Sequence, residues 1–344
     1  MNVAQQLRAA AAERILIKDG AYGTQVQNRR LREADYAGSL GLSRDQKGNN
    51  DLLNLTQPEL VRDICQNFAD AGAELLATNS FNANRISQAD YGAENLVREI
   101  NCAAARIIAE VAEREAQKDG RKRWTVGALG PTNKTLSLSP NVNDPGYREI
   151  DFDTLSDVYV EQIEGLVEGG AEIVLIETVF DTLNAKAAVH AAKRVDRDLP
   201  IMLSMTITDL SGRNLSGHSI EAFWASVRHA RPLSIGLNCS FGASQLRAHV
   251  AALSGIADTL IMAYPNAGLP NDLGEYDEGP AETAAQVREW CEQGIVNIVG
   301  GCCGTTPAHI GAIAEAVKGF EPRKIAEPTR RTVLAGIEPM VLAA

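Results

Sequence analysis

The sequence predicts an α/β protein of the (β/α)8 TIM-barrel type, because short apolar runs alternate with longer helical patterns along the chain. The runs are rich in Val, Ile and Leu and end in Gly, Asn, Thr or Glu, which is typical of parallel strands buried on both faces. Eight such runs occupy residues 14–20, 73–81, 124–131, 171–181, 200–208, 234–242, 259–268 and 295–304. Their even spread favours a closed barrel, with a doubly wound sheet as the alternative.

The segments between these runs carry helix signals. Pro58 follows Thr56 at the start of one helical pattern, and Gly294 follows the last residue of another, as expected for a first-turn proline and a C-terminal glycine. The N-terminal stretch MNVAQQLRAAAAE predicts a short amphipathic helix. The clearest helical patterns cover residues 58–73, 153–171 and 282–294.

The repeated strand–helix units are predicted to form one domain over residues 1–323. The remaining segment, 324–344, carries two prolines and no clear secondary-structure pattern. We therefore expect this segment to be a tail or linker that follows the barrel.

Composition narrows the partners and the compartment. The 344 residues carry a formal net charge of −11, which argues against nucleic acid and anionic membrane as main partners. The sequence has no apolar stretch of the roughly 18 residues that a membrane-spanning helix needs. Its N-terminus lacks the long apolar region of a signal peptide, so we expect a cytoplasmic protein.

Three cysteines follow predicted strands, at the end where barrel enzymes build their active sites. Cys239 follows SIGLN near the end of the sixth run, and Cys302 and Cys303 follow IVNIVGG near the end of the eighth, within GGCCG. These strands are near neighbours around a barrel, and the adjacent glycines allow the turn that lets the thiols converge. Soft thiolates suit zinc, and a zinc ion with three protein ligands keeps a position open for water or substrate. The sequence therefore predicts an open zinc site.

Other interpretations of these residues remain at this point. A lone cysteine at a strand end is usually a small buried hydrophobic residue, and an adjacent pair can serve as a redox device. Cys65, Cys102 and Cys291 lie in helical patterns, and we assign them to packing. Surface positions, and not roles as catalytic bases, are expected for the histidines His190, His218, His229, His249 and His309.

The sequence resembles the homocysteine S-methyltransferase family in three motifs: DGAYGTQVQ (19–27), GLNCSFGA (236–243) and GGCCGTTPAHI (300–310). More narrowly, it is similar to the homocysteine-binding module of cobalamin-dependent methionine synthase, and this likeness extends from about residue 12 to residue 318. The narrower likeness rests on the segments 50–61, 78–84, 127–153 and 263–271.

The resemblance implies a homocysteine-binding barrel whose zinc ligands are Cys239, Cys302 and Cys303. It also implies a reaction in which homocysteine binds zinc through its sulfur and accepts a methyl group to become methionine. Free alkyl thiols have a pKa near 8.5, so only a small part is thiolate at neutral pH. Coordination by zinc deprotonates the thiol and leaves a nucleophile for an electrophilic methyl group.

The substrate also carries an ammonium and a carboxylate group. Asp19 and Glu177 end two apolar strands, where a carboxylate is costly unless it meets a cation, so we expect them to receive the ammonium. The alternative is that they cap the following helices or accept local backbone amides. Asn238, next to Cys239, is expected among the substrate-binding residues, where it would fix the site by hydrogen bonds, with a purely structural role as the alternative. Contacts to the substrate carboxylate are expected from Gly20, Gly23 and Thr24.

The methyl donor is not fixed by these residues, because betaine-, S-methylmethionine- and cobalamin-dependent enzymes share the cysteine motif. The likeness over 127–153 favours methylcobalamin. The sequence ends at Ala344, where the resemblance would continue into folate- and cobalamin-binding modules, so we expect either a truncated chain or a corrinoid- or folate-binding partner on another polypeptide. A non-catalytic zinc- or thiol-binding subunit, or a redox sensor, is the alternative class.

Overall fold

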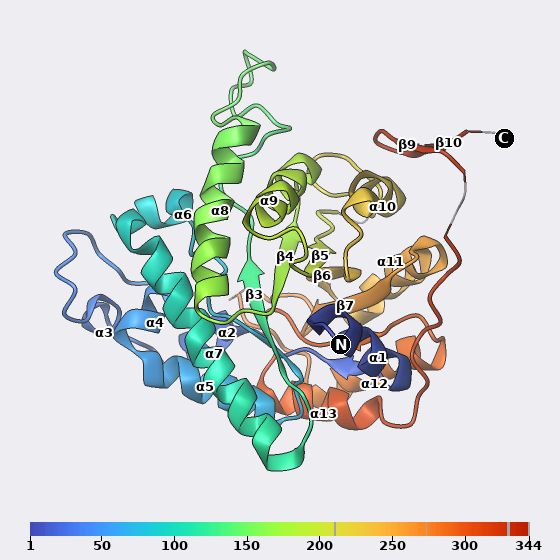
Figure 1. The fold of residues 1–344 in the computed structure, drawn as a ribbon, viewed down its shortest axis with the longest axis horizontal. Coiled ribbons are helices and arrows are strands. Elements are labelled where there is room, and N and C mark those ends of the chain that lie inside the picture. The colour runs from blue at the N-terminus through green and yellow to red at the C-terminus, as the bar shows by residue number, and fades with distance from the viewer. Residues whose placement is uncertain (210, 273, 329–330, 343–344) are drawn as a thin grey trace.

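A computed structural model describes residues 1–344 except 210, 273, 329–330 and 343–344. It is a single barrel of parallel strands surrounded by helices (Figure 1), as the sequence predicts. Each strand lies within one of the predicted apolar runs. The strands are β1 (Leu16–Ile17), β2 (Leu75–Ala77), β3 (Trp124–Leu129), β4 (Ile173–Val179), β5 (Ile201–Met205), β6 (Ser234–Gly242), β7 (Leu260–Asn266) and β8 (Ile298–Val299).

The sheet closes on itself. Its hydrogen-bonded order is β1-β8-β7-β6-β5-β4-β3-β2, and every neighbouring pair is parallel. A parallel bridge between Lys18 and Leu75 joins β1 to β2, where the amide of Glu74 donates to the carbonyl of Ile17 at 2.8 Å. The doubly wound alternative is therefore excluded, because an open sheet keeps two unpaired edges.

Helices connect successive strands on the outside of the barrel. The three clearest helix predictions are confirmed as α5 (Pro58–Asp70), α8 (Phe152–Glu168) and α12 (Pro280–Glu292). The others are α1 (Val3–Glu13), α2 (Tyr22–Asn28), α3 (Glu33–Ala37), α4 (Leu53–Thr56), α6 (Arg85–Ala89), α7 (Val97–Asp119), α9 (Thr182–Val195), α10 (Ile220–Val227), α11 (Ala243–Ile256) and α13 (Pro307–Ala316), with short 3-10 helices η1 (Asn50–Leu52), η2 (Glu94–Leu96) and η3 (Arg228–Ala230).

Strand residues alternate between two cores. On β4, Ile173 and Leu175 belong to the core inside the barrel, whereas Val174 and Ile176 belong to the core between barrel and helices. This is the two-residue period of an extended strand. The predicted N-terminal helix, α1, adds its Leu7 and Ala11 to the inner core. It closes the end of the barrel where the strands begin, so access to the interior lies at the other end.

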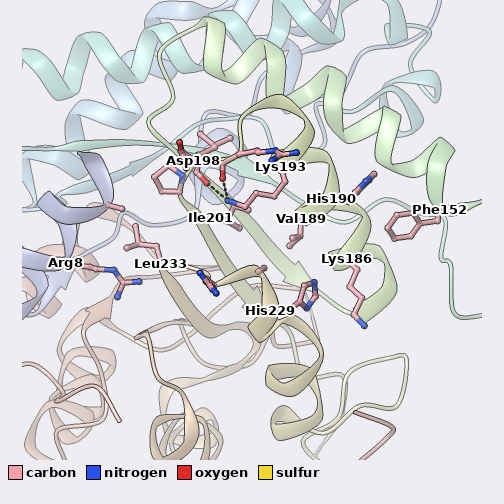
Figure 2. A pocket seen from close by; sticks show the side chains of 16 residues that line it. Arg8, Phe152, Lys186, Val189, His190, Lys193, Asp198, Ile201, His229 and Leu233 are labelled. Carbon is pink, nitrogen blue, oxygen red and sulfur yellow. Dashed lines mark hydrogen bonds between the residues drawn. The ribbon is translucent and has the colours of Figure 1, made fainter. Parts of the chain in front are cut away.

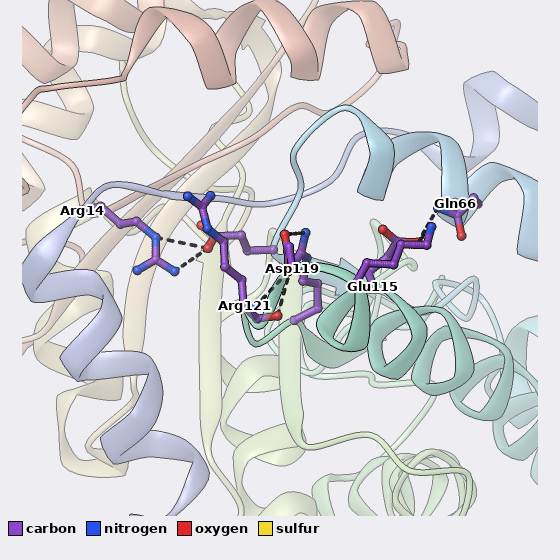
Figure 3. A network of polar contacts seen from close by, with 8 residues as sticks. Arg14, Gln66, Glu115, Asp119 and Arg121 are labelled. Carbon is purple, nitrogen blue, oxygen red and sulfur yellow. Dashed lines mark hydrogen bonds and ion pairs between the residues drawn. The ribbon is translucent and has the colours of Figure 1, made fainter.

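Ion pairs and an amide hydrogen bond connect elements at the end of the barrel where β1, β2 and β3 begin (Figure 3). Arg14, just before β1, donates through Nε to Glu74, just before β2, at 3.1 Å. Arg123, just before β3, donates to Asp119 at the end of α7 at 2.8 Å. Gln66 of α5 donates to Glu115 of α7 at 2.8 Å. These contacts fix strand starts and helix ends together at the face opposite the candidate site.

Two segments depart from the compact barrel. Residues 130–151 form a long irregular connection that rises above α8 in Figure 1. In the segment 324–344 the prediction of no clear element was wrong, because β9 (Val333–Ala335) and β10 (Pro339–Val341) form an antiparallel hairpin. The amide of Ser219 donates to the carbonyl of Ile337 at 3.0 Å, which ties the hairpin turn to the start of α10. Among the described helices, none combines the length and apolar character required to span a bilayer.

Candidate metal centre

The structure brings the three predicted cysteines together at the ends of β6 and β8. The sulfur of Cys303 lies 3.9 Å from that of Cys239 and 4.0 Å from that of Cys302. All three sulfurs fall within 4.8 Å of one another, and each side chain is only partly buried. Within the described residues, this is the one group of ligand side chains close enough to share a metal ion.

Cys239 reaches this cluster through an unusual backbone conformation. Asn238 points into the barrel, so regular alternation would turn the next side chain outward. Cys239 and Ser240 instead have φ values of 62° and 63°, in the left-handed region that costs a non-glycine residue about 1–2 kcal/mol. The pairing of β6 with β7 shifts register between Asn238 and Gly242. The strand therefore bends so that two successive side chains face the site.

Glycines allow the other two cysteines to approach. A Cβ on Gly300 would lie 2.8 Å from the Lys18 side chain, and one on Gly301 would lie 2.4 Å from Thr305. Gly304 has a φ of 80° and packs under Tyr276. The prediction that glycines serve this turn is thus refined: two of them are required by close packing and one by backbone conformation.

Polar groups surround the sulfurs. Asn238 is fully buried and donates from Nδ2 to Thr178 Oγ1 at 2.9 Å and to the Cys302 sulfur at 3.8 Å. Its Oδ1 accepts a hydrogen bond from Ser204 at 2.6 Å. Hydrogen bonds from Cys302 and Cys303, helped by the Ser240 amide, lower the pKa of the Cys239 thiol to about 3. The cluster thus stabilises negative charge on the Cys239 sulfur, while the hydrogen bonds to Cys239, together with burial, raise the pKa of Cys302 and bring that of Cys303 to about 11.

The sulfur positions fit a zinc ion. Tetrahedral zinc with Zn–S bonds of about 2.3 Å holds its sulfur ligands about 3.8 Å apart. The two short sulfur–sulfur distances here are 3.9 and 4.0 Å. The donor set is three thiols with hydrogen bonds from neighbouring amides, which is the chemistry and outer-shell support that zinc sites use. Cys239, Cys302 and Cys303 could therefore hold zinc and leave a fourth position open.

A buried charged group lies deeper in the barrel. The Lys18 ammonium contacts Asp19 Oδ1 at 2.9 Å and lies 4.7 Å from the centre of the Tyr264 ring. Asp19 Oδ2 accepts the Ala77 amide at 2.7 Å, and Tyr264 donates to Glu177 Oε2 at 2.9 Å. Burial would lower the pKa of Lys18, but the carboxylates of Asp19 and Glu177 raise it, so the amine stays protonated.

Because of Lys18, the two carboxylates Asp19 and Glu177 differ in their capacity to receive a further cation. Asp19 already meets a cation of its own chain, and each of its oxygens has a protein partner. Glu177 has the Tyr264 hydroxyl as its hydrogen-bond partner, and burial raises its pKa despite the nearby lysine. Glu177 is therefore the carboxylate with more capacity left for a further cation.

The remaining expected substrate contacts lie beside the cysteines. Thr24 Oγ1 accepts the Gly304 amide at 3.0 Å, so its hydroxyl proton remains available for another acceptor. Gly20 is packed against Phe68 and Thr305, where a Cβ would come within 2.8 and 2.9 Å of their side chains. These positions bring the segment after β1 next to the segment after β8.

Sequence reasoning missed Lys18, Tyr264 and Tyr276 near the site, and it assigned no role to Asn266, a strand-end residue that could contact substrate. Lys18 and Tyr264 follow the alternation of inward residues on β1 and β7, so a count of every second residue would have found them. Asn266 is buried at the end of β7, its amide helps lower the pKa of Cys239, and its Oδ1 has no partner among the described residues. Burial, and then the nearby Cys303, raise the pKa of Tyr276. Its loop gave no sequence signal.

One histidine prediction was wrong. His309 is buried, and its two ring nitrogens bond to Thr306 Oγ1 at 2.9 Å and to the carbonyl of Glu278 at 2.9 Å. It therefore fixes the start of α13 instead of lying on the surface. Packing roles for Cys65 and Cys291 are confirmed, since both are buried within helices.

Replacing Lys18 with methionine is expected to destabilise the protein by about 3–5 kcal/mol, because Asp19 would stay buried without its cation. The double variant Lys18→Met with Asp19→Asn should recover part of this loss, since it removes both charges. Urea unfolding of the wild type and the two variants measures the difference. A single variant as stable as the wild type would contradict a structural role for this pair.

Comparison with known proteins agrees with the fold. The family model described as homocysteine S-methyltransferase matches residues 16–317. The oxidized form of the homocysteine methyltransferase MmuM from Escherichia coli has a TM-score of 0.73 at 19% identity, with 91% of this chain and 99% of that chain covered. Its metallated form gives 0.71 at 20% identity, with 90% and 98% covered. These structural matches show the fold. Because the family match spans most of the chain, the chain belongs to the homocysteine S-methyltransferase family of enzymes.

Proposed function

We propose that this chain is a zinc-dependent homocysteine S-methyltransferase that forms methionine, with residues 1–323 as the homocysteine-binding domain and 324–344 as a tail. The observation that carries the proposal is the convergence of three sulfurs at the open end of the barrel. Three soft donors on rigid strand ends suit a metal whose remaining position takes a substrate sulfur.

Cys239, Cys302 and Cys303 would hold the zinc ion. When bound there, zinc supplies an electrophilic partner that lowers the pKa of the substrate thiol and so increases its nucleophilicity. A metallated form of MmuM supports a bound metal in a protein of the same fold. Asn238 keeps Cys302 and the Thr178 segment in place, because its amide reaches both.

The amino-acid end of homocysteine would be held by the inner charged group. Glu177 accepts the substrate ammonium, and Tyr264 orients the Glu177 carboxylate by its hydrogen bond. Asp19 adds its negative charge beside Lys18, and its oxygens can accept further hydrogen bonds from the ammonium. The Gly20 amide and the Thr24 hydroxyl proton are proposed to meet the substrate carboxylate, because Thr24 Oγ1 is held in place by Gly304.

Methylcobalamin is the proposed methyl donor, carried by a corrinoid-binding partner or module, as in the resemblance to methionine synthase. The long connection 130–151 supports a bulky donor, because it stands at the rim that follows β3, on the same end of the barrel as the cysteines. Val142 and Tyr147 on this connection are exposed at 93% and 46%, which offers apolar contacts to a large partner.

The donor assay tests the proposal directly. Zinc-loaded protein with homocysteine is expected to convert methylcobalamin, seen as methionine production together with loss of the methylcobalamin spectrum. Betaine and S-methylmethionine are assayed in parallel. Turnover only with a small donor would reject methylcobalamin and keep the family chemistry. Zinc-free protein that is fully active would reject the metal role and reopen a redox function for the adjacent cysteines.

A further inference from the structure

A groove lies at the end of the barrel opposite the candidate metal centre, where β5 and β6 begin (Figure 2). Its volume is about 800 Å³, and α1, α9 and the 3-10 helix η3 contribute its walls. In Figure 2, Lys186, His190 and Lys193 project from α9, and Arg8 approaches from α1 on the other side. Cys239 is at the far end of β6, so this groove is separate from the candidate metal centre.

Positive charge dominates the lining of the groove. Its charged and titratable lining residues in the described chain are Arg8, Lys186, His190, Lys193, Arg197, Asp198, His229 and Arg231. They include five lysines and arginines against a single carboxylate, although acidic residues outnumber basic ones, 44 to 33, in the whole chain. The positive charges of such a basic surface repel one another and attract anions.

None of these five cations has an ion-pair partner among the residues that the structure describes, and Lys193 instead donates to the backbone carbonyls of Arg197 at 2.8 Å and Leu199 at 3.3 Å. Neighbouring cations outside the groove do pair. Arg194 on α9 bonds Asp157 at 2.6 Å, and Arg228 at the start of η3 bonds Asp258 at 2.6 Å. These acidic partners lie on neighbouring elements, Asp157 on α8 and Asp258 after α11, and Asp198 is the one carboxylate in the lining of the groove.

The interior of the groove combines apolar walls with fixed imidazoles. Val189, Leu199 and Leu233 are buried lining residues that offer an apolar floor. His190 is held by Ser156 at 3.0 Å and packs against Phe152, with ring centres 5.6 Å apart. His229 is held through Nδ1, which bonds the carbonyl of Ser226 at 3.0 Å, so this contact does not use its Nε2.

We propose that this groove binds a small organic polyphosphate of the nucleoside triphosphate class. Guanidinium groups match phosphate oxygens in two-pronged contacts, and Lys186 adds a point charge. The volume lies in the range of small-ligand sites, and the apolar floor with Phe152 suits a planar base. The proposal does not depend on the methyltransferase function, because the two sites lie at opposite ends of the barrel.

Isothermal titration of the purified full chain with ATP, in a buffer of low ionic strength and with inorganic tripolyphosphate as a second probe, tests the site. We expect saturable ATP binding with a dissociation constant below about 1 mM. Replacing Arg8, Lys186 or Arg231 with glutamate should weaken it at least about 10-fold, because each change removes a charge-assisted contact and adds repulsion. Arg106→Glu, the same charge change on the exposed side of α7, is the matched control and should bind as the wild type does.

Measuring both methyl transfer and ATP binding in each variant distinguishes the two sites. The groove variants should keep zinc and methyl transfer, and Cys239→Ser should keep ATP binding. Absence of saturable ATP binding would overturn the proposal, as would an equal loss in Arg106→Glu. A poly-glutamate peptide that binds more tightly than ATP would replace the small phosphate ligand with an acidic protein segment. Circular dichroism melting of each variant confirms that loss of binding is not loss of folding.

Discussion

Cys239→Ser is expected to abolish both zinc binding and methyl transfer. Serine keeps the size of the side chain but replaces a soft sulfur with a hard hydroxyl oxygen that zinc seldom selects at such sites. Loss of even an outer-shell partner lowers metal affinity by about 10- to 100-fold, so loss of a direct ligand should exceed about 100-fold. The same result is expected for Cys302→Ser and Cys303→Ser, because the three sulfurs form one cluster.

Cys102→Ser is the matched control. Cys102 is also a partly buried free cysteine, but it lies on α7 and its sulfur accepts a hydrogen bond from Arg106 at 3.4 Å. This variant should keep stoichiometric zinc, measured by plasma emission spectroscopy, and full methyl transfer. Retained activity in Cys239→Ser would reject the ligand assignment. An equal loss in Cys102→Ser would indicate that replacing any partly buried cysteine damages the protein, and would not support a metal site at Cys239.

The sequence supports the barrel and the cysteine cluster for a simple physical reason. Strands buried on both faces leave continuous apolar runs, and the carboxyl ends of parallel strands must meet at one end of a barrel. Residues that follow different strands, such as Cys239 and Cys303, then become neighbours although they lie far apart in sequence. Both the fold prediction and the grouping of the three thiols depend only on this rule.

Other features required coordinates. The left-handed conformation of Cys239 breaks the alternation of β6, and no residue pattern marks a non-glycine residue for that region. Tyr276 reaches the cysteines from the loop after β7, whose path is set by tertiary contacts. Lys18 is different, because alternation on β1 already places it inside the barrel. Its ammonium contacts Asp19, so one cation beside that carboxylate comes from the chain itself.

Glu177→Gln is expected to weaken homocysteine binding by about 30-fold or more while zinc content stays unchanged. Truncating one partner of a buried charge pair costs about 2–5 kcal/mol, and 2 kcal/mol corresponds to about 30-fold in affinity. Glutamine keeps the acceptor that Tyr264 uses, so the change removes charge and preserves shape. Titration of zinc-loaded protein with homocysteine, together with the KM of methyl transfer, measures the loss.

A substrate analogue makes this prediction specific to the ammonium group. 4-Mercaptobutanoate has the thiol and carboxylate of homocysteine but lacks its amine. The wild type should strongly prefer homocysteine, and Glu177→Gln should lose most of that preference, because the two ligands differ only where Glu177 acts. Glu172→Gln is the control: Glu172 stands at the opposite end of the same strand, paired with Lys122, and should leave the preference intact. If Glu177→Gln weakens both ligands equally, Glu177 organises the site instead of binding the ammonium; if it weakens neither, the recognition of the ammonium passes to Asp19.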